Sequence, residues 1–314
     1  MIGVYGADGF IGRHLVRRLI ERGRPVRAVS RRFDRDFADE VEDLADLVAA
    51  DLSQPLAMAS SLQDVSTVVQ LMSSSSPGLK NDHAVADITE NVVPHVEFLQ
   101  NCLRAGVKRY IFLSSGGTVY GPGAPVPTPE TAPTNPINSH GLTKLFVEKY
   151  IQMHGHVDGL EYIILRVANP FGPGQTFRKG QGLVPAIIER WQKGQPVRIF
   201  GDGAARRDYI FISDVIDAIE AAIAVGGNPQ HILNVGSGET RSINEVVEAI
   251  EAAAGFTLQR EYVAARSTDV DVACLDISQA RAVLGWTPKM EFRAGIATTV
   301  LQMVVDTPGK TETR

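Results

Sequence analysis

The sequence has little of several features that define other classes of protein. It contains only two cysteines, Cys102 and Cys274, whose spacing fits neither a disulfide framework nor a metal site, so we expect reduced thiols and no metal. No apolar run approaches the roughly 18 residues of a membrane span. Met1 leads directly into an apolar strand pattern rather than into a secretion signal. We therefore expect a cytoplasmic protein without a membrane partner.

Basic residues are not in excess. The 31 Lys and Arg residues against 36 Asp and Glu residues give a net charge of −5, which argues against a nucleic-acid-binding surface because phosphates attract cations. The chain is otherwise of globular composition, with 44% apolar and 21% charged residues. A few local arginines can still bind a phosphorylated small molecule.

Short apolar runs alternate with amphipathic segments up to about residue 167. The runs predicted as strands are Ile2–Tyr5, Val26–Val29, Thr67–Leu71, Tyr110–Leu113 and Tyr162–Val167. This alternation predicts an α/β fold, a Rossmann-type doubly wound parallel sheet whose ligand crevice lies at the carboxyl ends of the strands. Residues 73–76, a run of four serines, are interpreted as a polar loop after one of these strands.

The sequence pattern changes after Asn169, where loops rich in glycine and proline replace the regular alternation of strand and helix segments. We therefore expect a dinucleotide-binding domain of residues 1–167, joined by residues 208–236, and a smaller C-terminal α/β substrate lobe of residues 168–207 and 237–314. Two long predicted helices, around residues 82–105 and 139–155, are candidates for the interface of a homodimer.

Gly6, Gly9 and Gly12 form a GxxGxxG pattern between the first predicted strand and a helix over Phe10–Glu21. Glycine suits this place because the turn is tight and the backbone must come close to a pyrophosphate at a helix N-terminus. The pattern therefore predicts dinucleotide binding.

The end of the second strand differs from an NAD-binding pattern. A carboxylate is usual there to hold the ribose diol, but the strand ends in Ser30, Arg31 and Arg32. The two arginines fit the 2′-phosphate of NADP or are simply solvated beside the adenine, and the sequence leaves both alternatives open. Asp51 and Leu52, which follow a further strand expected between Val29 and Asp51, are placed to meet the adenine.

Five further motifs follow in order: Leu113–Gly121 (LSSGGTVYG), His140 with Lys144, Arg166–Gly174 (RVANPFGPG), Gly201–Tyr209 with its Arg-Asp-Tyr, and Leu284–Pro288 (LGWTP). Together with the glycine loop they resemble the extended short-chain dehydrogenase/reductase family, in particular its NAD-dependent nucleotide-sugar epimerases and dehydratases. The resemblance spans the chain from Gly6 to Pro288.

This resemblance implies a transient hydride transfer. Bound NAD takes a hydride from a sugar carbon, usually C4, while the tyrosine of a Tyr-x-x-x-Lys motif removes the hydroxyl proton, and the hydride then returns. Here His140 stands at the tyrosine position, four residues before Lys144 and on the same helix face. The position of the partner Ser or Thr is Gly116, so Ser115 and Thr118 are the candidates for the missing hydroxyl.

Because His140 and Gly116 replace the family's tyrosine and its Ser or Thr, two interpretations of the catalytic site remain open. A neutral imidazole accepts a proton at pH 7 without activation, so His140 can replace a phenolate. Alternatively, the chain binds a nucleotide sugar without turning it over. We expect an active enzyme.

The absence of carboxylates just after Gly116 limits the classes of reaction that the site can catalyse. Related dehydratases and decarboxylases carry acidic residues at the positions of Gly117 and Thr118. Epimerisation, most simply at C4, needs only a roomy pocket and is the leading hypothesis, in a polysaccharide or glycoconjugate pathway. An NADP-dependent ketosugar reductase is the second.

The resemblance also assigns binding roles. The substrate, a UDP-, GDP- or dTDP-linked sugar, is expected to contact Tyr120, Asn169, Arg207 and Arg266. The cofactor, NAD or alternatively NADP, is expected to contact residues from the glycine loop to the end of the last strand: Gly6, Gly9, Phe10, Ile11, Gly12, Ser30, Arg31, Arg32, Asp51, Leu52, Leu71, Asn91, Ser114, His140, Lys144 and Val167.

Overall fold

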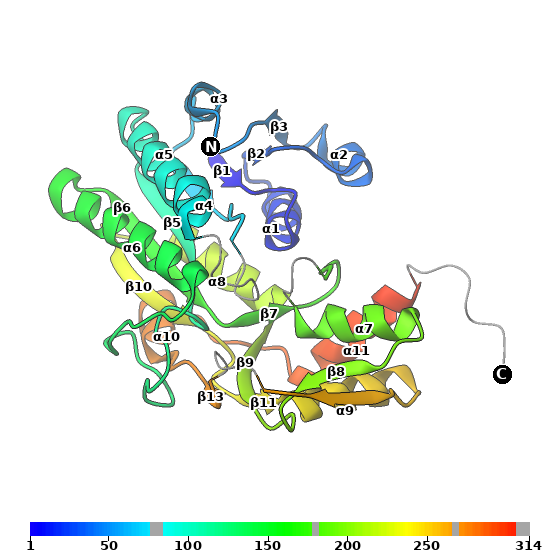
Figure 1. Ribbon diagram of the computed structural model, residues 1–314. Helices are drawn as coiled ribbons and strands as arrows, with labels where there is room; N and C mark the ends of the chain where they lie inside the picture. Colours follow the sequence, from blue (N-terminus) through cyan, green and yellow to red (C-terminus); the bar gives the residue numbers. More distant parts are fainter. Residues whose placement is uncertain (76–83, 178–181, 266–269, 306–314) are drawn as a thin grey trace.

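A seven-stranded parallel sheet forms the centre of the molecule (Figure 1). The structure, a computed structural model, describes residues 1–75, 84–177, 182–265 and 270–305. The strand order is β10-β6-β5-β4-β1-β2-β3, which confirms the predicted doubly wound sheet. The strands are β1 (Ile2–Tyr5), β2 (Val26–Ser30), β3 (Asp46–Ala49), β4 (Thr67–Gln70), β5 (Arg109–Ser115), β6 (Glu161–Val167) and β10 (Gln230–Val235).

Helices cover both faces of this sheet, as crossover connections between parallel strands require. One hydrophobic core contains Leu15 of α1 and Val215 of α8, and the other contains Phe98 of α5 and Val147 of α6. The helices between these strands are α1 (Phe10–Glu21), α2 (Arg35–Val41), α3 (Pro55–Ser60), α4 (Ala84–Asp87), α5 (Val93–Arg104), α6 (Ser139–Asp158) and α8 (Ile212–Ala224).

The helix expected over residues 82–105 is interrupted by a π-helical turn, η2 (Ile88–Val92). Pro94 has no N–H to donate, and the N–H of Val93 reaches back five residues to the carbonyl oxygen of Ile88. The turn carries Asn91, which is buried. The expected span of 82–105 ran through Pro94, where a proline interrupts regular helical hydrogen bonding, and apolar periodicity alone does not register that break.

Smaller sheets follow β6. In one, β9 (Arg206–Phe211) pairs with β7 (Asn169–Phe171), β11 (Thr240–Ser242) and β13 (Val272–Ala273), and in the other β8 (Val197–Phe200) pairs with β12 (Arg260–Val263). The remaining helices are α7 (Leu183–Gln192), α9 (Ile243–Ala254), α10 (Ser278–Leu284) and α11 (Phe292–Val305). Helices α7, α9 and α11 lie together at the lower right of Figure 1. Between β9 and β11 the chain passes through α8 and β10, which belong to the large sheet and its cover.

Candidate active site

The glycine loop makes a close turn between β1 and α1. Gly6 has a φ of 92°, in the left-handed region that favours glycine. Gly9 precedes α1, and a Cβ atom at Gly12 would lie 2.7 Å from the Ala7 Cα atom. Gly12 therefore packs directly on the backbone of the turn, and Gly6, Gly9 and Gly12 form a glycine cradle of the kind that suits a dinucleotide pyrophosphate at the start of α1. The predicted contacts Phe10 and Ile11 form the first turn of this helix.

Arg31, which follows β2, lies near the acidic side chain of Asp51, which follows β3. The Nε atom of Arg31 lies 3.6 Å from Oδ2 of Asp51, and both side chains reach solvent. Hydrogen bonds from Ser53, opposed by burial, lower the pKa of the Asp51 carboxyl, so this group is ionised at neutral pH. Its charge partly balances Arg31 and weakens the case for a 2′-phosphate beside this arginine. Leu52 follows Asp51, and Arg32 is exposed.

The two catalytic candidates lie buried on one face of α6. The side chain of Asn138 caps this helix by accepting a hydrogen bond of 2.8 Å from the N–H of Gly141. His140 and Lys144 are only 7% and 8% exposed. Nζ of Lys144 donates to the carbonyl oxygen of Leu113 at 2.9 Å, which places the ammonium beneath the end of β5.

Burial sets the protonation of both side chains. It lowers the pKa of His140 to about 3, with a further contribution from the charge of Lys144. It also lowers the pKa of Lys144 to about 8, although the nearby Glu148 opposes the shift. His140 is therefore neutral at physiological pH and has a free nitrogen lone pair, while Lys144 remains mostly protonated.

A buried ion pair lies one further turn along α6. Nη2 of Arg166 lies 2.7 Å from Oε2 of Glu148, and both side chains are almost fully buried. Ser114 donates its hydroxyl to Glu148 at 2.5 Å. The guanidinium of Arg166 lies 4.8 Å from the centre of the Tyr120 ring, whose hydroxyl donates to Asn234 at 2.7 Å. This network ties α6 to the ends of β5, β6 and β10, and it directs the predicted cofactor contact Ser114 toward Glu148.

The loop after β5 holds the other polar candidates. Oγ1 of Thr118 is buried and has no hydrogen-bond partner among the described residues. An unpartnered buried hydroxyl is costly and marks a place for a ligand or water. Ser115 is partly buried at the end of β5. Thr118 therefore remains the stronger candidate to donate to a sugar oxygen.

Gly116 has no space for a side chain. A Cβ atom there would lie 2.5 Å from Cδ1 of Leu275 and 2.9 Å from the carbonyl oxygen of Arg166. Leu275 follows β13 and is distant in the sequence, so its role was not visible in the motif. The absence of a serine at residue 116 is thus matched by a leucine that packs against the same position.

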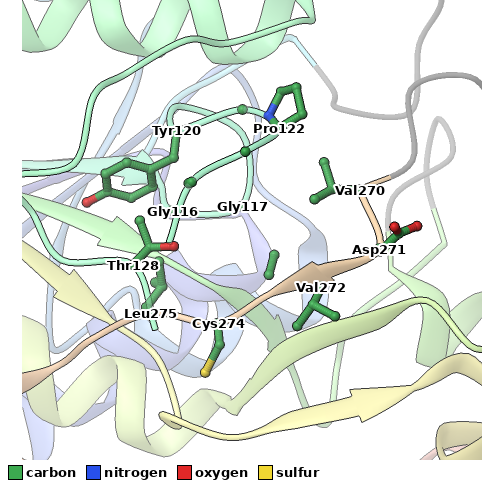
Figure 2. A pocket seen from close by; sticks show the side chains of 14 residues that line it. Gly116, Gly117, Tyr120, Pro122, Thr128, Val270, Asp271, Val272, Cys274 and Leu275 are labelled. Carbon is green, nitrogen blue, oxygen red and sulfur yellow. The ribbon is translucent and has the colours of Figure 1, made fainter. Parts of the chain in front are cut away.

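A pocket of about 340 Å³ opens between this loop and the segment around β13. Figure 2 shows Gly116, Gly117 and Tyr120 on one side, facing Val272 and Leu275 on the other. The remaining lining residues are Gly121, Pro122, Gly123, Ala124, Thr128, Val270, Asp271, Ala273 and Cys274. The walls are mostly apolar or glycine, and they include neither His140 nor Lys144.

Two further predicted substrate contacts, Asn169 and Arg207, are tied to backbone groups near this pocket. Asn169, on β7, donates from Nδ2 to the carbonyl oxygen of Asp208 at 2.8 Å. Nη1 of Arg207, on β9, donates at 2.5 Å to the carbonyl oxygen of Val270, a residue of the pocket. Arg266 lies outside the described residues.

Two predicted cofactor contacts lie at the ends of strands of the large sheet, and a third, Asn91, lies in η2. Leu71 follows β4 and is half-buried, and Val167 is buried at the end of β6. Asn91 uses Oδ1 to accept the N–H of Ser74 at 2.8 Å and that of Ser75 at 3.3 Å. Its side chain therefore holds the loop after β4.

Comparison with known proteins identifies the family. Residues 2–236 match the NAD dependent epimerase/dehydratase family. The chain belongs to this family. It is 35% identical to a UDP-glucose 4-epimerase of Mycolicibacterium smegmatis, over 95% of this chain and 96% of the relative. It is 32% identical to an Escherichia coli dTDP-4-dehydro-6-deoxyglucose reductase, over 93% and 94% of the two chains.

A solved structure supports the same assignment. The chain superimposes with a TM-score of 0.88 on the UDP-glucose 4-epimerase of Thermus thermophilus in complex with NAD. The two sequences are 28% identical, and the superposition covers 96% of this chain and 98% of the other. The predicted resemblance to nucleotide-sugar epimerases is thereby confirmed.

Proposed function

We propose that this protein is an NAD-dependent nucleotide-sugar 4-epimerase in which His140 takes the place of the tyrosine base. The observation that carries the proposal is the burial of a neutral His140 beside Lys144 at the carboxyl end of β5. The similarity of the whole chain to UDP-glucose 4-epimerases supports the substrate class, a UDP-linked sugar.

His140, Thr118 and Lys144 have different roles in the proposed proton transfer. The chemistry that NAD would supply when bound in the glycine cradle is the reversible acceptance of a hydride. His140 removes the proton of the C4 hydroxyl and later restores it. The unpartnered hydroxyl of Thr118 donates to the oxygen on which charge develops, and the charge of Lys144 favours the same oxygen. Because residues 117 and 118 carry no carboxylate, the ketosugar is not drawn into elimination.

The binding roles form part of the same proposal. Asn169, Arg207 and Arg266 hold the nucleotide diphosphate, for which the planar guanidinium is suited. We divide the chain as the sequence predicts, with residues 1–167 and 208–236 for the cofactor and residues 168–207 and 237–314 for the substrate. The glycine cradle at Gly6 and Gly12 holds the pyrophosphate of NAD.

Turnover without net redox change tests the proposed function. The purified holoenzyme, incubated with UDP-glucose or UDP-galactose, is expected to interconvert them without consuming NADH or NADPH, and the nucleotide released on denaturation is expected to have the mass of NAD. Chromatography of the UDP-sugars and absorbance at 340 nm measure both. Stoichiometric NADPH consumption with a 4-ketosugar would instead establish the reductase activity of the Escherichia coli relative.

A homodimer is the proposed assembly. Apolar side chains on α6 are exposed at intervals of about one or two helical turns: Leu142, Phe146, Met153 and Val157. The adjacent segment from α4 to α5 exposes Val85, Ile88 and Val93. Such a stripe on two neighbouring helices is typical of a face that packs against its own copy as four helices.

The substitution Phe146→Asp is expected to shift the protein from dimer to monomer, because it buries a charge in the proposed interface. Light scattering after size-exclusion chromatography measures the mass. The control is Leu56→Asp on α3, which is also an exposed apolar position, 86% accessible, but lies outside the stripe. A monomeric parent protein, or equal dimer fractions in both variants, would contradict the proposed interface.

The cellular location is a further part of the proposal. Among the described helices, none is long and apolar enough to cross a membrane. Both cysteines are buried and unpaired. These findings support the proposed cytoplasmic location, where nucleotide sugars are made as activated donors for polysaccharide or glycoconjugate synthesis.

A further inference from the structure

The loop after β4 brings a hydroxyl to the proposed base. Oγ of Ser75 lies 2.8 Å from Nδ1 of His140, and Ser75 is only 5% exposed. The sequence interpretation treated this serine run as a polar loop. In the structure, Ser75 contacts His140 on α6, although the two residues are 65 positions apart in the chain.

A second serine continues the chain of hydroxyls. Oγ of Ser73 lies 3.1 Å from Oγ of Ser75, and Ser73 is exposed to solvent. Ser73 Oγ also donates to the carbonyl oxygen of Ser75 at 3.4 Å. Its lone pairs therefore remain available to accept the hydroxyl proton of Ser75. Ser75 Oγ can then accept from Nδ1–H of His140, one of the two directions that the 2.8 Å contact allows.

This direction of hydrogen bonding selects one form of the imidazole. With the proton on Nδ1, the lone pair of His140 is on Nε2 and can accept a proton from the substrate. If Ser75 instead donated to Nδ1, the proton of the neutral ring would be on Nε2, and Nε2 could not accept the substrate proton. Asn91 fixes the backbone of the loop by accepting from the N–H groups of Ser74 and Ser75, so the hydroxyl is positioned before substrate binds.

We propose that Ser75 and Ser73 form a proton relay that connects His140 to solvent. The sugar hydroxyl gives its proton to Nε2 as Nδ1–H passes to Ser75 Oγ; the Ser75 proton passes to Ser73 Oγ, and the Ser73 proton passes to water. Reversal of these steps returns the proton when the hydride returns. The inference rests on the proposed role of His140 as base.

The environment of His140 explains why a relay is useful. Burial and the charge of Lys144 lower the pKa of the ring to about 3, so an imidazolium is unfavourable there. A relay lets the ring exchange one proton for another and remain neutral. Gly116, where the family carries a hydroxyl, cannot supply one because Leu275 and the Arg166 carbonyl oxygen occupy the space. Ser75 therefore supplies the hydroxyl that hydrogen-bonds to the ring, while Thr118 keeps its proposed role toward the sugar oxygen.

The kinetic test uses Ser75→Ala, Ser75→Thr and a matched control, Ser74→Ala. Ser74 lies in the same loop and directs its hydroxyl to Glu90 and Asn91 rather than to His140. In the holoenzyme, Ser75→Ala is expected to lower kcat for UDP-sugar epimerisation roughly tenfold or more with little change in KM. Ser75→Thr is expected to restore most of the rate, and Ser74→Ala to behave like the parent.

A spectroscopic test does not depend on turnover. Nitrogen NMR of ¹⁵N-histidine-labelled holoenzyme reports which ring nitrogen carries the proton, and His140→Gln assigns the signal by its loss. The parent is expected to show the Nδ1–H form, and Ser75→Ala to shift toward the Nε2–H form or a mixture of the two. The Nε2–H form in the parent would overturn the relay.

The two tests separate the relay from the proposed function. If Ser75→Ala matches the parent in kcat while His140→Ala is inactive, His140 remains the base but the relay is wrong. If the parent interconverts no UDP-sugar, the proposed function is wrong, and so is the role of the relay in catalysis. The NMR result then still decides whether Ser75 sets the form of His140.

Discussion

Replacement of His140 by alanine is expected to lower kcat for UDP-sugar epimerisation by about 10²- to 10⁴-fold, the range typical of losing a general base. Removal of the ring takes away the proposed proton acceptor and breaks the hydrogen bond of 2.8 Å to Ser75. Bound NAD should remain, because the glycine cradle at Gly6–Gly12 is untouched. Rates with UDP-glucose and the NAD content of the purified protein measure the two effects.

The variant His140→Tyr provides the informative control because it restores the residue expected from the family resemblance. A tyrosine must ionise before it accepts a proton, and its ordinary pKa is near 10, so its rate should rise with pH. The parent should show no such rise between pH 5 and 7.5, because His140, with a pKa of about 3, is already neutral. This range also keeps Lys144 largely protonated. A parent rate that rises steeply with pH, or an active His140→Ala variant, would show that another group is the base.

The substitution Glu148→Ala is expected to destabilise the folded protein by about 3–5 kcal/mol, the usual cost of removing one partner from a buried ion pair. The carboxylate is fully buried, and it accepts from Arg166 at 2.7 Å and from Ser114 at 2.5 Å. Its loss leaves the Arg166 charge buried without its partner. The shift of the denaturation midpoint in urea, followed by circular dichroism, measures this change.

Two comparisons make the Glu148 result specific. Glu40→Ala breaks an ion pair of similar length, 2.6 Å to Arg17, but on the surface, and should cost less than about 1 kcal/mol. The double variant Glu148→Met with Arg166→Met removes both charges and should recover part of the stability. Equal losses for Glu148→Ala and Glu40→Ala would indicate that the buried pair does not hold α6 to the sheet.

Local pattern was enough to predict most of the cofactor domain. The helix Phe10–Glu21 and the strand Ile2–Tyr5 begin and end as expected, because their glycine loop and apolar periodicity are local signals. The Tyr110–Leu113 strand is longer in the structure, Arg109–Ser115, because its polar ends pair with β6. The π-helical turn before Pro94 was not foreseen, since hydrogen-bond register is not visible in composition.

The sequence by itself determined the family motifs, the departure at His140 and Gly116, and the spacing that places His140 and Lys144 on one helix face. Tertiary structure alone decided which groups surround them. Ser75 reaches His140 across 65 residues of sequence, and Leu275 fills the space beside Gly116 from a distant part of the chain. Helical spacing is local and can be counted along the chain. The partner of a buried imidazole depends on how separate strands end at one edge of the sheet, and that arrangement exists only in the folded chain.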